Sequence, residues 1–136
     1  MGESAAIDKL LGRARLRLDR VAPADLEAEV AAGAVVVDIR PVEQRQRDGE
    51  LPGALVIDRN VLEWRLDPSS PYRLPGMDDP DARLIIVCNE GYGSSLAAAT
   101  LQDLGLANAT DLVGGYQAWL TDGPSGHASR TVRDES

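Results

Sequence analysis

The sequence predicts a single α/β domain with a mainly parallel central sheet of about five strands and helices on both faces. Short apolar segments alternate with segments of helical spacing, which is the pattern of a parallel sheet. Residues 84–87 (Leu-Ile-Ile-Val) contain no polar side chain, as expected of a strand covered on both faces. The length of 136 residues fits one domain, since single domains cluster at ~100–150 residues.

The predicted strands are rich in valine and isoleucine, which favour extended backbone. They span residues 35–39, 54–58, 84–87 and 110–113. The predicted helices span residues 5–18, 23–32, 43–50, 60–66, 94–104 and 116–120. In the helix over 94–104, Leu96, Ala99, Thr100 and Leu104 share one face. Residues 67–82, rich in proline and aspartate, are expected to form a loop.

The first predicted helix is amphipathic, because Ile7, Leu10, Leu11, Ala14 and Leu18 recur at helical spacing with arginines between them. It is expected to pack on the domain. A protein partner or a second copy of the chain is an alternative occupant for the face formed by residues 5–18. We divide the chain into this N-terminal helix (1–17), a domain (18–121) and a flexible C-terminal tail (122–136).

Charge and cysteine content exclude several classes of function. The net charge of −8 disfavours binding to nucleic acid or to an anionic membrane, and no apolar run approaches the ~20 residues that span a bilayer. Residues 1–20 nevertheless carry a net +2, either as a solvated helix face or as a docking site for an acidic partner. One cysteine rules out an internal disulfide and a multi-cysteine zinc site, and we expect a reducing cytoplasm and no metal.

Cys88 follows the most apolar strand and precedes a glycine-containing loop and a helix. Such glycines let backbone amides turn inward to form an anion-binding nest, and the helix adds the positive end of its dipole. These features favour the thiolate and would hold the outer sulfur of a persulfide. A small buried hydrophobic side chain is the alternative interpretation of a single cysteine.

Four motifs occur in order along the chain. They are Asp38-Ile39-Arg40, Gly49-Glu50-Leu51-Pro52-Gly53-Ala54, the loop from Cys88 to Ser94, and Gly114-Gly115-Tyr116-Gln117-Ala118-Trp119. Over residues 18–121 the sequence resembles the single-domain rhodanese-like sulfurtransferases. The resemblance implies a three-layer α/β fold, no cofactor, a small sulfur donor and a thiol or protein acceptor. It also implies a catalytic, persulfide-carrying Cys88 and a substrate-binding loop formed by Asn89, Glu90, Gly91, Tyr92, Gly93 and Ser94.

Two loop positions depart from the family pattern. Gly93 stands where the family often has arginine, and Glu90 places a carboxylate near the site, which would disfavour a dianionic donor such as thiosulfate. Persulfide chemistry is therefore expected more firmly than thiosulfate use. The related phosphatases need an arginine six positions after the cysteine to clamp phosphate, and Ser94 occupies that position here.

Several residues outside the loop are candidates for supporting roles. Arg40, Arg59 and Arg65 could form a cationic rim of the pocket, whereas ion pairing with Glu63 or Asp67 is the alternative for the last two. In the family, Asp38 and Arg40 more often brace the active-site loop. His127, the only histidine, lies in the predicted tail, so a fixed Cys–His dyad is not expected.

Two functions from different classes fit these observations. The first is a sulfurtransferase that moves sulfane sulfur through a persulfide on Cys88 to a nucleophilic acceptor. The second is a non-catalytic rhodanese-like module that binds a partner or senses oxidants through Cys88.

Overall fold

The protein is built around a parallel sheet of four strands in the order β2-β1-β3-β4. The computed structural model describes residues 5–123. The strands are β1 (Val35–Asp38), β2 (Leu55–Val56), β3 (Leu84–Val87) and β4 (Thr110–Asp111). An isolated parallel bridge between Val21 and Leu112 extends the sheet beyond β4. The predicted parallel α/β architecture of about five strands is confirmed.

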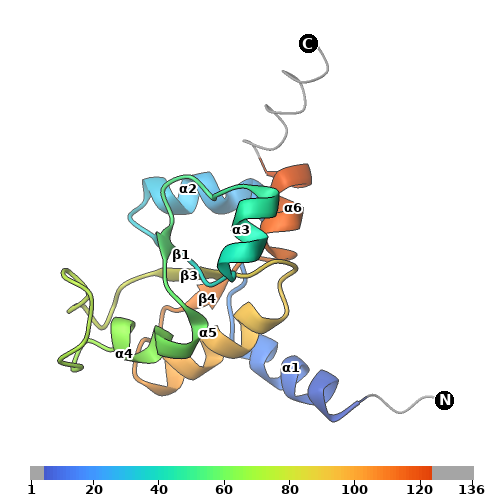
Figure 1. Ribbon diagram of the computed structural model, residues 1–136. Helices are drawn as coiled ribbons and strands as arrows, with labels where there is room; N and C mark the ends of the chain where they lie inside the picture. Colours follow the sequence, from blue (N-terminus) through green and yellow to red (C-terminus); the bar gives the residue numbers. More distant parts are fainter. Residues whose placement is uncertain (1–4, 124–136) are drawn as a thin grey trace.

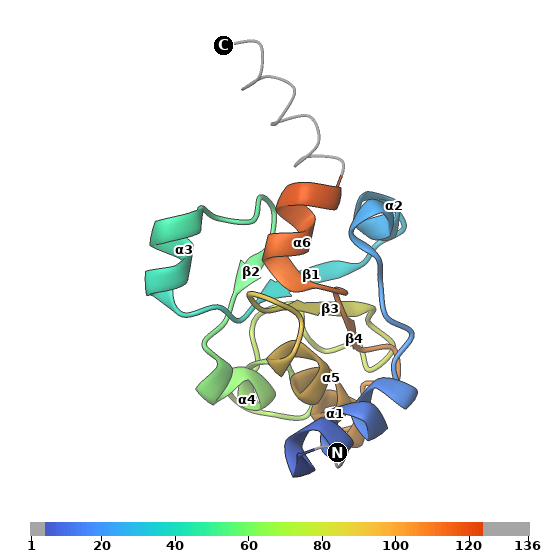
Figure 2. The ribbon, with the colours of Figure 1, turned by 90° about the vertical axis from the view of Figure 1, so that its right-hand side faces the viewer.

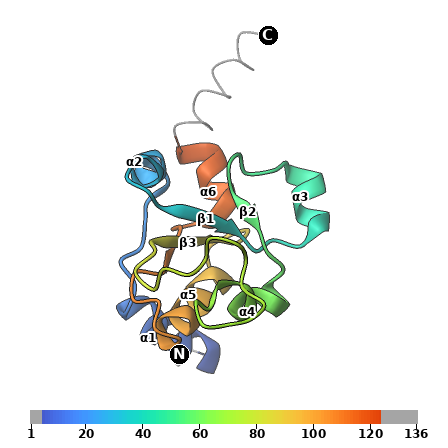
Figure 3. The same cartoon turned by 90° about the vertical axis from the view of Figure 1, so that its left-hand side faces the viewer.

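Helices cover both faces of this sheet. They are α1 (Ala6–Leu16), η1 (Pro23–Asp25), α2 (Leu26–Ala31), α3 (Val42–Asp48), η2 (Arg59–Val61), α4 (Leu62–Leu66), α5 (Gly93–Asp103) and α6 (Gly115–Asp122). Figure 1 shows α2, α3 and α6 above the sheet and α1, α4 and α5 below it. Views from the right-hand and left-hand sides of Figure 1 show the same three-layer arrangement (Figures 2 and 3). No helix among residues 5–123 is long and apolar enough to cross a membrane.

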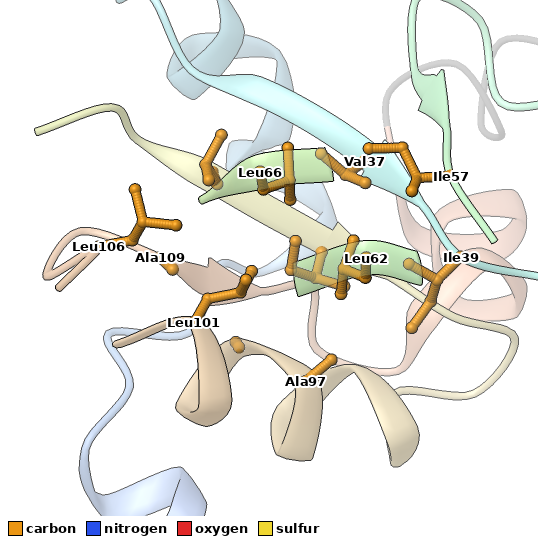
Figure 4. Close-up of a cluster of buried hydrophobic side chains, with 12 residues drawn as sticks. Val37, Ile39, Ile57, Leu62, Leu66, Ala97, Leu101, Leu106 and Ala109 are labelled. Carbon is orange, nitrogen blue, oxygen red and sulfur yellow. The ribbon is translucent and has the colours of Figure 1, made fainter. Parts of the chain in front are cut away.

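The two central strands bury side chains on both faces, which explains their continuous apolar sequence. Val37, Leu84 and Ile86 belong to a core cluster with residues of α4 and α5, of which Leu62, Leu66 and Leu101 are fully buried (Figure 4). The alternate strand residues point to the other face, where a second cluster contains residues of α2 and α6. Its members are Val21, Leu26, Ala34, Val36, Leu51, Ile85, Val87, Leu112 and Tyr116.

The N-terminal helix packs against α5, as expected, and lies beneath it in Figure 2. Leu11 and Ala14 are buried in this contact, whereas Ile7, Leu10 and Leu16 stay exposed. Arg17 ties the two helices together, because its Nη2 donates to the Ala99 carbonyl and to the Asp103 carboxylate. Docking of an acidic partner or a second copy on the exposed face stays a prediction.

Some boundaries and faces differ from expectation. β2 is only two residues long and exposed, because it lies at the edge of the sheet and pairs with β1 alone. In α5, Ala97, Ala98 and Leu101 are buried toward the sheet. Of the residues predicted to share one face, Leu96, Ala99 and Thr100 border α1 instead, and Leu104 is exposed. The reason is that α5 lies between the sheet and α1. α6 continues to Asp122, and residues 124–136, including His127, lie outside the described part of the chain.

Candidate functional site

Cys88 occupies the carboxyl end of β3, beside the end of β1. The register pairs Asp38 with Val87, and the Ile39 N–H donates to the Val87 carbonyl at 2.9 Å. Cys88 is half-buried. Its Sγ accepts two backbone hydrogen bonds, from the N–H of Gly91 at 3.2 Å and from the N–H of Ser94 at 3.3 Å. Both donors favour a negatively charged sulfur.

The loop after Cys88 reverses tightly into α5. Gly91 is buried with φ +89°, and a Cβ there would lie 2.7 Å from the Gly114 nitrogen, so only glycine fits. α5 begins at Gly93, which places the Ser94 N–H in the first helical turn, where amides have no partner within the helix. The sulfur therefore lies at the positive end of an 11-residue helix.

A hollow of about 320 Å³ opens beside the sulfur, and we call it the Cys88 hollow. Its lining residues are Ile39, Arg40, Pro41, Gln44, Arg59, Cys88, Asn89, Glu90, Tyr92 and Gly93. A second hollow of about 530 Å³, the outer hollow, shares four of these residues with it. The shared residues are Ile39, Arg40, Pro41 and Arg59, and the outer hollow continues to Val42, Glu43, Arg45, Val56, Asp58 and Asn60. The two hollows therefore lie next to each other, and the Cys88 hollow is the one that reaches the cysteine.

The predicted loop residues use different atoms at the site. Glu90, Tyr92 and Gly93 are exposed and line the Cys88 hollow. The Asn89 side chain is turned to α6, where its Oδ1 accepts from Gln117 Nε2 at 3.0 Å. Ser94 presents only its backbone N–H to the sulfur, since its hydroxyl is buried and donates to Asp111 Oδ2 at 2.7 Å.

The three arginines that were candidates for the rim of the pocket occupy different positions in the structure. Arg59 lines the hollow, and its Nη1 pairs with both carboxylate oxygens of Glu63 at 3.0 Å, so its charge is partly offset. Arg65 is not among the lining residues, because its Nη1 donates to the Tyr72 carbonyl at 2.7 Å in the following loop. Arg40 borders the hollow, but its side chain is fully buried, so its guanidinium does not form the rim.

The Arg40 guanidinium instead binds Asp38 beneath the site. The Asp38 carboxylate accepts from Arg40 Nη2 at 2.8 Å, from Nε at 3.1 Å and from the Arg40 backbone N–H at 3.0 Å. The guanidinium also donates to the Gly49 carbonyl and lies 3.7 Å from the centre of the Tyr116 ring. Burial raises the pKa of Tyr116, whose backbone N–H donates to the Cys88 carbonyl at 2.9 Å. These contacts connect Asp38 to the cysteine loop through Arg40 and Tyr116 of α6, and the bracing role of Asp38 stays a prediction.

The Gly114-Gly115 pair lets α6 start directly against the cysteine loop. The Gln117 N–H donates to the Asn89 carbonyl at 3.1 Å, next to the Tyr116–Cys88 bond. Gly115 has φ +64°, and a Cβ there would lie 2.5 Å from the Cys88 carbonyl oxygen. This close backbone approach accounts for the second glycine of the motif.

We therefore expect Gly115→Ala to destabilise the fold and to displace the loop. The positive φ alone costs about 1–3 kcal/mol for a residue with a Cβ, and the contact with the Cys88 carbonyl adds to it. Chemical denaturation measures the loss. Gly76→Ala is the matched control, because Gly76 also has positive φ (+84°) but has no atom near its Cβ position. Equal losses in the two variants would contradict a specific role for the close approach.

Sequence reasoning missed three residues that contact the cysteine loop and the first turn of α5. Arg15 and Arg20, from α1 and the segment after it, both donate to the Gly91 carbonyl. Asp111, at the end of β4, is fully buried and accepts from Arg20, Ser94 and Ser95. No local sequence pattern marks these residues, because they lie 16 to 91 positions from their partners. Among residues 5–123, no cluster of three or more histidine, cysteine or acidic side chains could hold a metal ion.

Comparison with known proteins identifies the domain. The sequence pattern of the rhodanese-like domain family matches residues 22–122. The chain belongs to this family. The chain is 32% identical over 105 residues to the thiosulfate sulfurtransferase GlpE of Pseudomonas entomophila, with 77% of this chain and 87% of that protein covered. It is also 32% identical to the adenylyltransferase and sulfurtransferase UBA4 of Candida albicans, over 76% of this chain but only 24% of that protein. The chain thus spans about a quarter of the length of that relative.

Solved structures with rhodanese-like folds superpose on the domain. A protein of unknown function from Rhodopseudomonas palustris, described as a possible tyrosine phosphatase, has a TM-score of 0.77 and 35% identity, covering 91% of this chain and 98% of that one. The human single-domain sulfurtransferase TSTD1 has a TM-score of 0.62 and 25% identity, covering 76% of this chain and 96% of that one. The fold and the family-level assignment to sulfurtransferases therefore agree.

Proposed function

We propose that this rhodanese-like domain is a sulfurtransferase that carries sulfur as a persulfide on Cys88. The observation that supports this best is the position of the sulfur. It accepts two backbone N–H bonds at the start of α5 and borders an open hollow. A thiolate held in this way is ready for nucleophilic attack on a sulfane sulfur.

The reaction is a two-step exchange that needs no separate oxidant or reductant. In the first step the Cys88 thiolate attacks the sulfane sulfur of the donor, the donor's bond to that sulfur breaks, and its electron pair leaves with the remainder of the donor. With thiosulfate the leaving group is sulfite. With 3-mercaptopyruvate, whose thiol sulfur is bonded to carbon, the carbon–sulfur bond breaks and the electron pair leaves on the pyruvate enolate, which takes up a proton to give pyruvate. In the second step an acceptor thiolate attacks the outer sulfur, and the sulfur–sulfur bond breaks to return the Cys88 thiolate. The acceptor leaves as its own persulfide.

The donor is the less constrained part of the proposal. GlpE relatives are named for thiosulfate, which supports a small anionic donor. The exposed Glu90 carboxylate on the hollow opposes a dianion, although water screens its charge. Arg59 supplies a cation on the same hollow but shares it with Glu63. We therefore expect weaker use of thiosulfate than of a monoanionic donor such as 3-mercaptopyruvate.

The acceptor is proposed to be a thiol, on a small molecule or a protein, that approaches along the outer hollow. The outer hollow, at about 530 Å³, falls within the ~300–1,000 Å³ that is usual for ligand pockets. Val42 and Val56 line it and are exposed, and Arg45 and Asp58 supply charges of both signs. A mixed lining of this kind suits a peptide more than a simple anion.

Phosphatase chemistry, suggested by the description of the Rhodopseudomonas palustris structure, is not proposed for this chain. The phosphate clamp of that chemistry requires an arginine at the end of the cysteine loop. Ser94 stands at that position, and its hydroxyl is buried against Asp111. Arg15 and Arg20 bind the outside of the loop, at the Gly91 carbonyl, and are engaged there.

Intact-mass spectrometry after incubation with thiosulfate, or separately with 3-mercaptopyruvate, tests the proposal. The expected result is a gain of one sulfur atom that cyanide or a thiol removes. Because Cys88 is the only cysteine in the chain, protein alkylated beforehand is a matched control and should gain nothing. Reduced, alkylatable protein that takes no sulfur from either donor would contradict the proposal and favour the binding or redox-sensing module.

A further inference from the structure

The carbonyl of Gly91 is held by two guanidinium donors on the side of the loop that faces α1. Arg15 Nη2 donates at 2.7 Å and Arg20 Nη2 at 3.1 Å. Ser95 Oγ lies 3.3 Å from the same oxygen, but its single proton is directed to Asp111 Oδ2 at 2.7 Å. Arg15 also lies over the Tyr92 ring, with its Cζ 5.5 Å from the ring centre. Two cations therefore converge on one backbone oxygen of the cysteine loop, and both come from the N-terminal segment.

This contact fixes the orientation of the peptide between Gly91 and Tyr92. A trans peptide is planar, and its C=O and N–H point in opposite directions. With the Gly91 carbonyl held toward the arginines, the Tyr92 N–H points away from them. The hydrogen bonds of residues 5–123 do not include this N–H as a donor. The preceding amide, the Gly91 N–H, donates to Cys88 Sγ.

The same arginines are linked to the second donor of the sulfur through Asp111. The buried Asp111 carboxylate accepts from Arg20 Nε at 2.8 Å and from the hydroxyls of Ser94 and Ser95, each at 2.7 Å. Ser94 is the residue whose N–H donates to Cys88 Sγ. Arg15 Nε completes the cluster by donating to Ser95 Oγ at 3.1 Å. One connected set of side chains thus contacts both residues whose N–H groups hold the sulfur, Gly91 at its carbonyl and Ser94 at its hydroxyl.

These contacts come from residues that precede the part of the chain matched by the family pattern. The pattern begins at residue 22, so both arginines lie outside it. Arg15 is near the end of α1, and Arg20 lies in the segment that leads to the Val21 bridge with Leu112, next to Asp111. The N-terminal segment is therefore packed on the site as well as on the domain.

We propose that Arg15 and Arg20 are positioning residues that orient the amides of the Cys88 loop and so set the reactivity of the sulfur. They act through Gly91, Ser94 and Ser95 and do not touch Cys88. The proposal rests on Cys88 being the reacting sulfur of the proposed function. It makes the N-terminal helix part of the site, so that disturbing α1 alters the chemistry at a distance from the hollow.

The test compares Arg15→Ala with Arg17→Ala across a pH series. Both arginines join α1 to α5, but Arg17 binds Ala99 and Asp103 and does not contact the loop. The measured quantity is the rate of alkylation of Cys88 by iodoacetamide from about pH 5 to 10, with thermal unfolding recorded for each variant. In Arg15→Ala we expect the pH of half-maximal rate to rise by about half a unit to one unit, because the thiolate loses oriented donors and a nearby cation. Arg17→Ala should keep the wild-type profile.

Arg20 is tested with a neutral pair, because removing it alone would leave Asp111 buried without its cation. The double variant Arg20→Gln with Asp111→Asn removes both charges and keeps a hydrogen-bonding group at each position. It should shift the alkylation profile in the same direction, and Arg15→Lys should restore part of the shift seen in Arg15→Ala. Unchanged profiles in Arg15→Ala and in the double variant, or equal shifts in Arg15→Ala and Arg17→Ala, would overturn the proposal.

Alkylation requires no sulfur transfer, so the two proposals fail separately. A shifted profile in protein that accepts no sulfur would keep the positioning role and reject the sulfurtransferase. Sulfur uptake by wild-type protein and Arg15→Ala with identical pH profiles would reject the positioning role and keep the sulfurtransferase.

Discussion

Replacing Cys88 by serine is expected to reduce sulfur transfer to the uncatalysed background. A serine hydroxyl is a weak nucleophile at neutral pH and forms no persulfide, so the covalent intermediate is lost altogether. The substitution should leave the loop in place, because Oγ can accept the same backbone bonds from Gly91 and Ser94 that Sγ accepts. Release of pyruvate from 3-mercaptopyruvate, with a thiol as acceptor, measures the loss.

The stability of the serine variant separates loss of chemistry from loss of fold. Cys88 is half-buried at the edge of the core, so we expect Cys88→Ser to cost no more than about 1–2 kcal/mol in free energy of unfolding. Turnover retained in the folded variant would contradict the role of Cys88. If wild-type protein fails to transfer sulfur but its cysteine forms a reversible sulfenic acid with peroxide faster than a free thiol, the redox-sensing module becomes the better explanation.

The central part of the fold could be predicted from sequence because it depends on local patterns. β3 is a run of apolar residues, and the structure explains the run by burying Leu84 and Ile86 on one face and Ile85 and Val87 on the other. The length of the edge strand β2 was overestimated from the sequence. Residues 54–58 have strand-like composition, but only Leu55–Val56 pair, since no strand lies on their outer side. Amino-acid composition does not show whether a strand lies at the centre or at the edge of the sheet.

The apolar face of α5 shows a second limit of sequence reasoning. Leu96, Ala99 and Thr100 border a groove against α1, whereas the small residues Ala97 and Ala98 are fully buried toward the sheet. A helix covered on two sides has no single apolar face, and in α5 the large Leu101 is buried on the sheet side together with the two alanines. Periodicity alone does not distinguish this case from a helix on the surface.

The part of the site that could be predicted is the part that lies within one continuous loop. The cysteine, the two glycines and the helix start lie within residues 88–94, and their backbone geometry follows from that order. The arginines could not be assigned in this way. Arg40 and Arg59 both border the hollow, but the guanidinium of Arg40 is buried and that of Arg59 is partly exposed, because their partners are Asp38 and Glu63. The direction in which an arginine side chain points depends on its ion-pair partner in the folded protein, which the local sequence does not show.

Removal of the buried arginine beneath the site is expected to have the largest effect on stability. Arg40→Met keeps a side chain of similar length but leaves the fully buried Asp38 carboxylate without its cation. Breaking a buried ion pair by removing one partner costs about 3–5 kcal/mol, which is a large part of the ~5–15 kcal/mol that stabilises a typical domain. Chemical denaturation measures the loss, with Arg47→Met as control because Arg47 pairs with Asp48 on the surface and should change little.

The double variant Arg40→Met with Asp38→Asn tells whether the cost comes from an unpaired charge. An asparagine oxygen still accepts from the Arg40 backbone N–H, as Asp38 Oδ1 does, and no buried ion remains. We therefore expect the double variant to recover most of the stability that Arg40→Met loses, giving a coupling energy of at least about 2 kcal/mol in the cycle of single and double variants. Additive losses would contradict this explanation. They would indicate that Arg40 stabilises the fold through its contacts with Gly49 and Tyr116, and so supports the Cys88 carbonyl through α6 by packing rather than by charge.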